Sequence, residues 1–485
     1  MSLLEGVDWS GKIFAGRWQS GSGAPSEVVE PATGQVLGTV GVATPQDVVR
    51  AGDQAVTAQR EWAALPYLER SGVLQRAAML FEKHRAEIVG WIIREAGSTG
   101  FKGDIEVQSS IGECAEAAAL AGSPYGELLR SPMPRLSIER QIPVGVVAVI
   151  SPFNFPLILS MRSIAPALAL GNAVLLKPDL RTAVCGGVLI ARILQEAGLP
   201  EGVLQVLPGG ADVGSAMIDH PEVRVVSFTG STPAGRIIGA QAASTLTRAH
   251  LELGGNNALI VLDDVDLDAA ASCGTFGTFV HSGQVCMAVG KHLVHESVYD
   301  DYVVRLAKKA DALTVGDGYR ADVALGPMID QKQLDHAKDL VDRSVAAGAR
   351  LVAGGTHEGL FYRPTVLADC TPDIPAYAEE VFGPVACIRK FSTIEEAVAM
   401  ARDSEYGLGL GVLTNDLATA MSIVDRVPTG LVHINDQTIN DASNAPFGGV
   451  RASGTSRVGG RRANVEAFTE TQWMTIRATA PTYPF

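Results

Sequence analysis

The stretch Val144-Gly-Val-Val-Ala-Val-Ile-Ser151 runs directly into Pro152-Phe153-Asn154-Phe155-Pro156. Its first eight residues are apolar or small, as in a strand buried on both faces, and the prolines predict a turn before a helix to Leu170. Short apolar strands then alternate with helices: strands are expected at 173–176, 204–207 and 223–228, and helices at 182–197, 209–219 and 234–246. This pattern predicts an α/β fold with a doubly wound parallel sheet, in which ligands bind where strand carboxyl ends meet helix amino ends.

The alternation restarts after Leu253-Gly254-Gly255, with a strand at 258–262, and continues to about Asn435. We therefore expect a second α/β domain. On the other side of the opening stretch, 44–96 has helical periodicity, and Thr44-Pro45 is a typical helix start.

Residues 122–143 differ in composition from their neighbours. Pro124, Pro132 and Pro134 interrupt 122–141, and 135–142 alternates like an exposed strand. We interpret it as an arm that packs on a partner subunit, with a second strand at 465–476, and expect a homodimer or homotetramer. The expected division is a first domain of 1–121 and 144–254, a second domain of 255–464, and oligomerisation segments 122–143 and 465–485.

Composition argues against several classes of function. The 485 residues carry a net charge of −14 and no basic stripe, whereas nucleic-acid binding needs clustered Lys and Arg. The six cysteines form no CxxC pair and the nine histidines no HExxH pattern, so we predict neither a disulfide framework nor a metal site. Neither a signal peptide nor a membrane span is recognisable, so a cytoplasmic location is expected.

Two uncharged side chains, those of Cys286 and Asn154, are candidates for a catalytic site. Cys286 lies in His281-Ser-Gly-Gln-Val-Cys-Met-Ala288, where Gly283 permits close approach of another molecule. Such a thiol can act as a nucleophile once ionised, although most cysteines are inert packing groups. Asn154 can donate a hydrogen bond to a developing oxyanion or serve simply as a turn residue.

Two charged residues end predicted strands. Glu252 stands between leucines and before two glycines, so it either faces water or projects into a cleft, where burial raises the pKa of a carboxyl toward that of a useful base. Lys177 follows the strand 173–176 and precedes a proline, which suits a cation that binds a cofactor ribose or an ordinary solvated lysine.

With their flanking residues, these signals match a known family in the family's own order. The matching motifs are Ser151-Pro-Phe-Asn-Phe-Pro156, Lys177-Pro178, Phe228-Thr-Gly-Ser231, Leu251-Glu-Leu-Gly-Gly255, Gly283-Gln-Val-Cys286, Glu379-Glu-Val-Phe-Gly-Pro384 and Pro446-Phe-Gly-Gly449. Over nearly its whole length the chain resembles the aldehyde dehydrogenase superfamily. The resemblance implies a Rossmann-like cofactor domain, a catalytic α/β domain and a β-arm for oligomerisation.

The resemblance also implies a mechanism. Cys286 would attack the aldehyde as a thiolate, and Asn154 with the backbone N–H of Cys286 would hold the oxyanion of the thiohemiacetal. Hydride would leave for a nicotinamide, and Glu252 would activate water to hydrolyse the thioester. Relatives that transfer the acyl group to coenzyme A generally lack this glutamate, so its presence favours hydrolysis.

For the cofactor, the resemblance implies NAD or NADP. No GxGxxG motif occurs, and Gly230-Ser-Thr-Pro-Ala-Gly-Arg236 lacks the Lys-Ser/Thr of a P-loop, so an NTPase is rejected. The family's pyrophosphate meets the helix that opens at Gly230 and Ser231. The other cofactor-binding residues implied are Ser151, Pro152, Lys177, Glu380 and Phe382.

One position departs from relatives that are strict for NAD. These often carry a glutamate three residues after the lysine, and here Leu180 stands there, followed by Arg181. Without that carboxylate a 2′-phosphate meets less repulsion, and Arg181 could attract it. We therefore hypothesise that NADP is accepted as well as NAD; the alternative for Arg181 is a solvated helix-start residue.

The substrate pocket is expected to be apolar and aromatic. The residues implied are Phe155, Ile158, Leu159, Arg162, Val285, Met287 and Phe447. With Lys177-Pro-Asp-Leu-Arg-Thr182, Gly459-Gly-Arg-Arg-Ala-Asn464 and the Pro-Thr-Tyr-Pro-Phe485 ending, the chain looks like the benzaldehyde and vanillin dehydrogenase branch. We predict an aromatic aldehyde, and Arg162 either meets a ring substituent or forms a structural salt bridge.

Two rival functions remain. A semialdehyde dehydrogenase would use Arg162 or Arg451 to bind a distal carboxylate. A non-catalytic structural relative would have lost Cys286 or Glu252, and both are present.

Overall fold

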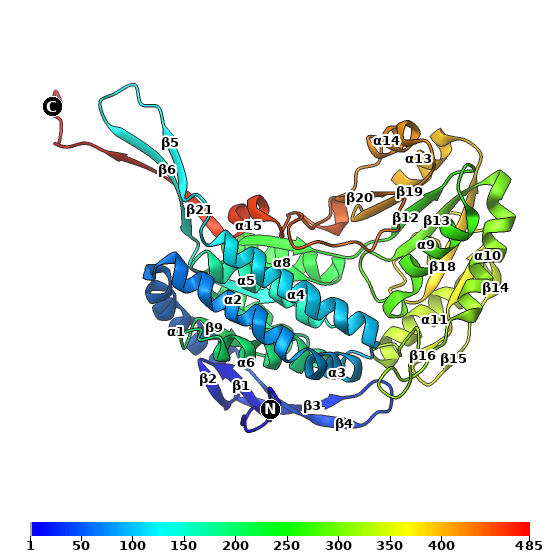
Figure 1. Ribbon diagram of the computed structural model, residues 1–485, viewed down its shortest axis with the longest axis horizontal. Coiled ribbons are helices and arrows are strands. Elements are labelled where there is room, and N and C mark those ends of the chain that lie inside the picture. Colours follow the sequence, from blue (N-terminus) through cyan, green and yellow to red (C-terminus); the bar gives the residue numbers. More distant parts are fainter. Residues whose placement is uncertain (1) are drawn as a thin grey trace.

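In the computed structural model, the described residues 2–485 form two seven-stranded sheets and a projecting three-stranded arm (Figure 1). The first sheet has the order β11-β10-β7-β8-β9-β1-β2. Its parallel strands are β7 (Val146–Ile150), β8 (Ala173–Lys177), β9 (Leu204–Val206), β10 (Val223–Thr229) and β11 (Arg248–Glu252); β1 (Lys12–Ala15) and β2 (Arg17–Ser20) pair antiparallel at the edge. The predicted doubly wound sheet is confirmed.

The order of strands also locates a crevice in this sheet. From β7 the chain passes to β8 and β9 on one side, and then to β10 and β11 on the other. The connections after β7 and β10 therefore diverge from neighbouring strands, and a crevice forms at their carboxyl ends.

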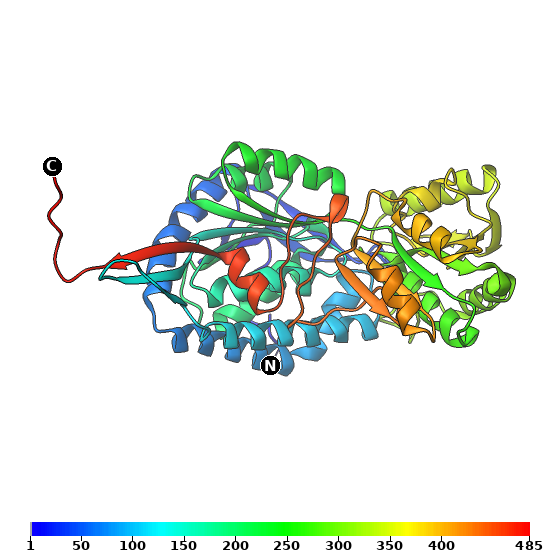
Figure 2. The ribbon, with the colours of Figure 1, turned by 90° about the horizontal axis from the view of Figure 1, so that it is seen from above.

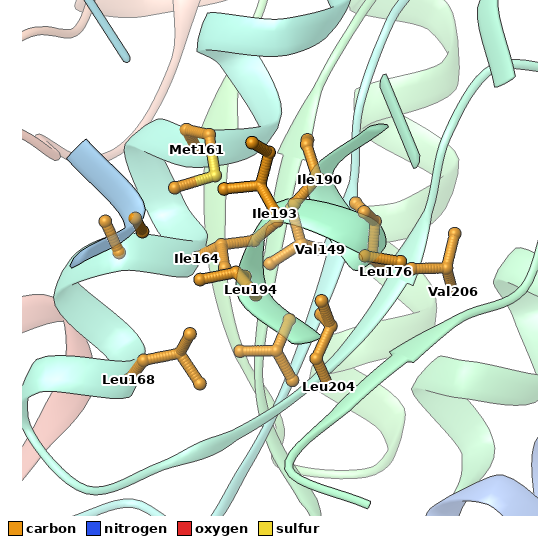
Figure 3. Close-up of a cluster of buried hydrophobic side chains, with 14 of the residues drawn as sticks. Val149, Met161, Ile164, Leu168, Leu176, Ile190, Ile193, Leu194, Leu204 and Val206 are labelled. Atoms are coloured by element: carbon orange, nitrogen blue, oxygen red, sulfur yellow. The ribbon is translucent and has the colours of Figure 1, made fainter. Parts of the chain in front are cut away.

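Both faces of the first sheet are buried by helices. Val147 and Val149 of β7 join the core beneath α5 (Pro156–Ala169) and α6 (Leu189–Glu196), and the alternate residues Val146, Ala148 and Ile150 join the core beneath α1 (Pro45–Ala64) and α7 (Ala211–Asp219). Figure 3 shows part of the first core: Met161, Ile164, Leu168, Ile190, Ile193 and Leu194 meet Val149, Leu176, Leu204 and Val206. Each such buried aliphatic side chain contributes roughly 1.5–3 kcal/mol to folding.

The predicted helical region 44–96 is resolved into α1, α2 (Tyr67–Lys83) and α3 (Arg85–Glu95). Thr44 caps α1, with Pro45 in the first turn and the Asp47 carboxylate accepting the N–H of Thr44 at 2.8 Å. Then follows α4 (Gly100–Leu120), and α8 (Thr232–Ser244) lies between β10 and β11.

The second sheet has the order β14-β17-β18-β13-β12-β19-β20. Its parallel strands are β12 (Asn257–Val261), β13 (Val289–His295), β17 (Thr365–Ala368), β18 (Val385–Phe391), β19 (Gly409–Leu413) and β20 (Leu431–Ile434), with β14 (Arg350–Ala353) antiparallel at the edge. Its helices are α9 (Leu267–Phe279), α10 (Tyr299–Ala312), α11 (Gln331–Ala346), α12 (Pro375–Ala378), α13 (Ile394–Arg402) and α14 (Leu417–Val424). Figure 2 shows the two sheet units side by side.

The arm extends away from the first unit (Figure 1). It contains β5 (Gly126–Leu129), β6 (Leu136–Pro143) and β21 (Thr469–Ile476), with β6 in the middle. Leu128, Trp473 and Ile476 of these strands are exposed large apolar residues. The remaining small pairs are β3 (Gly23–Val29) with β4 (Val36–Val42) and β15 (His357–Glu358) with β16 (Phe361–Tyr362). In the described part of the chain, no helix has the length and apolar character needed to cross a bilayer.

The predicted strand over 465–476 is wrong in its first part. Residues Arg461–Phe468 form helix α15, and β21 begins only at Thr469. Asn464, Ala467 and Phe468 are the buried residues of α15, and their spacing of three and four places them on one helix face, which packs on α5. Residues 477–485 follow β21 in irregular structure.

The chain also returns to the first sheet before the expected boundary at residue 464. The N–H of Leu253 donates to the carbonyl of Ser453 at 3.0 Å, and the N–H of Thr455 donates to that of Leu251 at 3.2 Å. The loops expected in 444–460 therefore lie against the end of β11, and Figure 1 shows this return between β20 and α15.

Candidate active site

The candidate site lies between opposite edges of the two sheets. Asn154 and Ser231 follow β7 and β10 at the carboxyl edge of the first sheet, whereas Cys286 and Glu380 precede β13 and β18 at the amino edge of the second. A cavity of about 470 Å³ is lined by residues from both. The strand–helix alternation predicts a site at the first edge, but not that the second sheet contributes its amino ends.

The loop before Cys286 has an unusual backbone. His281 and Ser282 have φ of 52° and 53°, and Gly283 follows with φ of 66°, so three successive residues are left-handed. Non-glycine residues adopt this region at a cost and persist there only when their surroundings hold them. A side chain at Gly283 would clash with the carbonyl of Gly383.

Hydrogen bonds hold this loop. The Ser282 hydroxyl donates to the carbonyl of Gly326 at 2.7 Å, and Gln284 Oε1 accepts the N–H of Ile329 at 3.0 Å. Asn257 Nδ2 donates to the carbonyls of Cys286 and Ala288 at 2.9 and 2.8 Å. Cys286 is thus fixed from both sides.

The surroundings of Cys286 in this structure disfavour ionisation of its thiol. Burial, with the nearby carboxyls of Glu380 and Glu252, raises its pKa to about 12, while Arg162 and the N–H of Met287 act in the opposite direction. A thiolate here therefore requires additional positive charge at the sulfur.

Asn154 is buried and lines the same cavity as Cys286. Its Nδ2 donates to the carbonyl of Gln284 at 2.9 Å. Because an amide nitrogen carries two hydrogens, a second donor remains for an oxyanion beside the sulfur.

Glu252 ends β11 and is buried, but it is outside the lining described for the cavity. Neither of its carboxylate oxygens finds a hydrogen-bonding partner within residues 2–485, and a side chain at Gly448 would clash with Oε1. Burial raises its pKa well above the ordinary value, and Arg457, Arg162 and the backbone N–H of Gly449 only partly offset this. A buried carboxyl with a raised pKa near a cysteine is typical of a catalytic site.

The cavity brings together most of the residues predicted to bind a dinucleotide. Its lining includes Ser151, Pro152, Lys177, Arg181, Gly230, Ser231, Glu380 and Phe382. Gly230 and Ser231 present the first turn of α8, which no side chain caps in the described structure, so its N–H groups suit an anion. The half-buried carboxyl of Glu380 accepts the N–H of Gly255 at 2.8 Å, and desolvation raises its pKa to about 7. These features fit a dinucleotide.

Leu180 and Arg181 do not form the open 2′-phosphate site that the sequence suggested. Leu180 lines a neighbouring hollow, while Arg181 borders both this hollow and the main cavity. The Arg181 guanidinium pairs with Asp179 at 2.8 Å and, across to α11, with Asp330 at 2.7 Å. Two carboxylates thus already balance the charge that was expected to attract a 2′-phosphate.

The predicted substrate residues divide into groups. Val285, Met287 and Phe447 form a buried apolar cluster against which Phe155 and Cys286 pack. Leu159 lines the cavity, and Ile158 is buried in α5 but belongs to neither group. Arg162 forms a structural salt bridge, the alternative to a contact with a ring substituent. It pairs with Glu113 at 3.6 Å and with Asp441, and its Cζ lies 4.3 Å from the centre of the Phe447 ring.

Several lining residues were missed by sequence reasoning. They are Phe153, Asp179, Phe228, Thr229, Leu253, Asp330, Lys332, Gln333 and His336. Phe153, Phe228 and Thr229 lie inside the quoted family motifs and Asp179 inside the stretch Lys177–Thr182, but no role was assigned to them. Asp330 caps α11 through the N–H of Gln333, a local signal of a helix start that says nothing about a site in the other unit.

The aldehyde dehydrogenase family profile matches residues 18–474. The chain belongs to the aldehyde dehydrogenase family. This aldehyde dehydrogenase is 57% identical to a vanillin dehydrogenase of Amycolatopsis sp., over 100% of both chains. It is 48% identical to a benzaldehyde dehydrogenase [NAD(+)] of Pseudomonas putida, over 98% of both. Among solved structures, it is similar to a betaine aldehyde dehydrogenase of Staphylococcus aureus in complex with NAD+, with a TM-score of 0.95, 30% identity, and coverage of 99% of this chain and 97% of that one.

Proposed function

We propose that this enzyme oxidises an aromatic aldehyde to the carboxylic acid with NAD as acceptor. The observation that carries the proposal is one cavity lined by Cys286, by the amide of Asn154 and by the uncapped start of α8. The names of the vanillin and benzaldehyde relatives support the aromatic substrate, and the NAD in one relative's name and in a similar structure supports the acceptor.

The first step forms a covalent bond. The sulfur of Cys286 loses its proton to water and attacks the aldehyde carbon as a thiolate, and the carbonyl oxygen becomes the oxyanion of a thiohemiacetal. The free N–H of Asn154 donates to that oxygen, as does the backbone N–H of Cys286. One such donor contributes about 2.7–4 kcal/mol to the transition state.

The second half releases the acid. Bound NAD would supply the acceptor for the hydride that leaves the thiohemiacetal, and positive charge close to the sulfur. Lys177 and Glu380 would hold its riboses and Phe382 its nicotinamide ring, since all three line the cavity. Glu252 turns from Gly448 toward the resulting thioester and takes a proton from water, which attacks the carbonyl carbon and expels the sulfur.

The charges around the pocket favour a neutral ring over a carboxylated aldehyde. Arg162 already has Glu113 and Asp441 as partners, so its charge is engaged and is not free for a substrate carboxylate. Arg451 is exposed and donates to the carbonyls of Arg402 and Ser404 at 3.1 and 2.9 Å. The semialdehyde alternative therefore loses both of its candidate anchors.

Three further features are proposed. The first domain of 1–121 and 144–254 binds the cofactor, and the second supplies Cys286. The exposed apolar residues of the arm support a homodimer or homotetramer built through β5, β6 and β21. A cytoplasmic location is supported by six cysteines that are all free in the described chain, since the mechanism needs a reduced thiol.

Steady-state rates on an aldehyde panel test the proposal. We expect kcat/KM for benzaldehyde and vanillin to exceed that for hexanal and succinic semialdehyde by at least about tenfold, or ~1.4 kcal/mol of differential binding. A clear preference for either aliphatic aldehyde would refute the aromatic assignment, and dependence of the product on added coenzyme A would refute hydrolysis.

A further inference from the structure

Helix α4 carries a buried ion pair that the proposed mechanism does not use. Lys102 and Glu106 stand one turn apart, their Nζ and Oε1 atoms are in contact, and the residues are 1% and 0% exposed. Removing two charges from water is costly, and apolar side chains of similar volume would often serve folding as well. The buried ion pair therefore indicates a role other than packing.

Glu106 fixes the start of α5. Its second oxygen, Oε2, accepts the N–H groups of Leu157 and Ile158 at 3.0 and 3.3 Å. The residue at the N-cap of α5 is Phe155, whose side chain cannot accept a hydrogen bond. The carboxylate thus replaces the missing cap and also suits the positive end of the helix dipole.

Lys102 fixes the residue next to Asn154. Its Nζ lies 4.4 Å from the centre of the Phe155 ring, a cation–π contact. The same ring meets the ring of His281, in the left-handed turn before Cys286, edge to face at 5.5 Å. Phe155 is therefore held by α4 on one side and by the cysteine loop on the other.

We propose that Lys102 and Glu106 are positioning residues that hold Asn154 in register with Cys286. Asn154 is held from two sides. It is joined to Phe155 through the backbone, and its Nδ2 donates to the carbonyl of Gln284 at 2.9 Å. Glu106 sets where α5 begins, and Lys102 sets where Phe155 lies; together they determine how far the free amide hydrogen is from the oxyanion. This inference rests on the proposed function, because it assumes that Asn154 stabilises that oxyanion.

The chain offers a matched control in Glu95. This carboxyl is also fully buried, and it accepts the N–H groups of Val184 and Cys185 at 2.8 and 2.7 Å at the start of the helical segment 184–196. It caps a helix in the same manner, but that helix does not follow Asn154. The segment 184–196 also packs on α5, where Ser160 Oγ donates to the carbonyl of Gly186 at 3.1 Å. Substituting Glu95 nevertheless leaves in place the contacts of Lys102 with Phe155 and of Glu106 with the N–H groups of α5.

The experiment compares the full-length variants Glu106→Gln, Lys102→Met, Lys102→Met/Glu106→Gln and Glu95→Gln. Three readouts are taken on each: kcat for benzaldehyde with NAD, the rate of Cys286 alkylation by iodoacetamide, and thermal unfolding. Alkylation displaces iodide at a saturated carbon and forms no oxyanion, so it reports on the thiol without Asn154.

We expect the three α4 variants to lose about tenfold in kcat, as for a small misplacement of a catalytic group, while alkylation stays unchanged. Glu95→Gln should keep its kcat at a comparable loss of thermal stability. If a single substitution prevents folding, the neutral double variant, which buries no unpaired charge, decides the question.

The proposal is overturned if the folded α4 variants keep their kcat, if alkylation falls in parallel with kcat, or if Glu95→Gln loses as much activity. An Asn154→Ala variant separates the two levels of inference. If it keeps normal kcat, the oxyanion role of Asn154 in the proposed function fails; if it alone loses activity, only the role of the ion pair fails.

Discussion

Burial disfavours the charged forms of both Cys286 and Glu252. The pKa of Cys286 is raised to about 12 and that of Glu252 well above its ordinary value. Each group therefore becomes reactive only when its surroundings change: the thiol when positive charge arrives, and the carboxyl when its pKa is passed or when water enters. Storing both groups in neutral form avoids a pair of adjacent buried charges.

The raised pKa of Glu252 gives a pH prediction. A base with an elevated pKa is protonated and inactive below that pKa, so hydrolysis of the thioester should accelerate as pH rises above the ordinary carboxyl range and through this raised pKa. Glu252→Gln should remove this pH dependence and slow hydrolysis by about 10²–10⁴-fold. Single-turnover rates of acid release from pH 6 to 9 check this, and an identical pH profile in the variant would contradict it.

At the residue scale, the sequence could indicate Cys286, Asn154 and Glu252 because their motifs are local. The sequence could not indicate their ionisation states or their hydrogen-bonding partners. The raised pKa of Glu252, which lies against Gly448, depends on residues almost 200 positions apart in the chain. Arg162 illustrates the same limit, since the sequence left its substituent and salt-bridge roles open and the two carboxylate partners favour the second.

The segment after β8 and helix α11 are joined across the cleft by Arg181. Its partners Asp179 and Asp330 both line the cavity, and the bridge to Asp330 spans 149 positions of the chain. No local pattern could reveal this link, so Arg181 was open to interpretation as a phosphate-binding residue. By contrast, the strand–helix alternation is local and was predictable; α15 was missed because its one buried face is only eight residues long.

The bridge predicts opposite effects on cofactor choice. Asp179→Asn should free part of the Arg181 charge and raise kcat/KM for NADP about fivefold, the effect of ~1 kcal/mol at a partly exposed pair. Arg181→Leu should leave two unpaired carboxylates and lower it by a similar factor. Rates with both cofactors check this; a native preference for NAD above about a thousandfold, roughly 4 kcal/mol, would defeat the hypothesis that NADP is accepted.

At the scale of the whole molecule, the site is formed between the carboxyl edge of one sheet and the amino edge of the other. The carboxyl edge of the first sheet supplies the uncapped α8 and Asn154, and the amino edge of the second supplies the loop of Cys286. General rules for parallel sheets predict the first half of this arrangement. The second half follows from how the chain crosses after Gly255 and returns through 447–458, which the sequence pattern does not encode locally.

The central claim is that the sulfur of Cys286 carries the acyl group during turnover. Mixing the Glu252→Gln variant with NAD and benzaldehyde, quenching in acid, and mapping peptides by mass spectrometry tests it directly. The account predicts one benzoyl group on the peptide containing Cys286, formed together with one equivalent of NADH. NADH production without acylation of that peptide, or acylation at another residue, would contradict it.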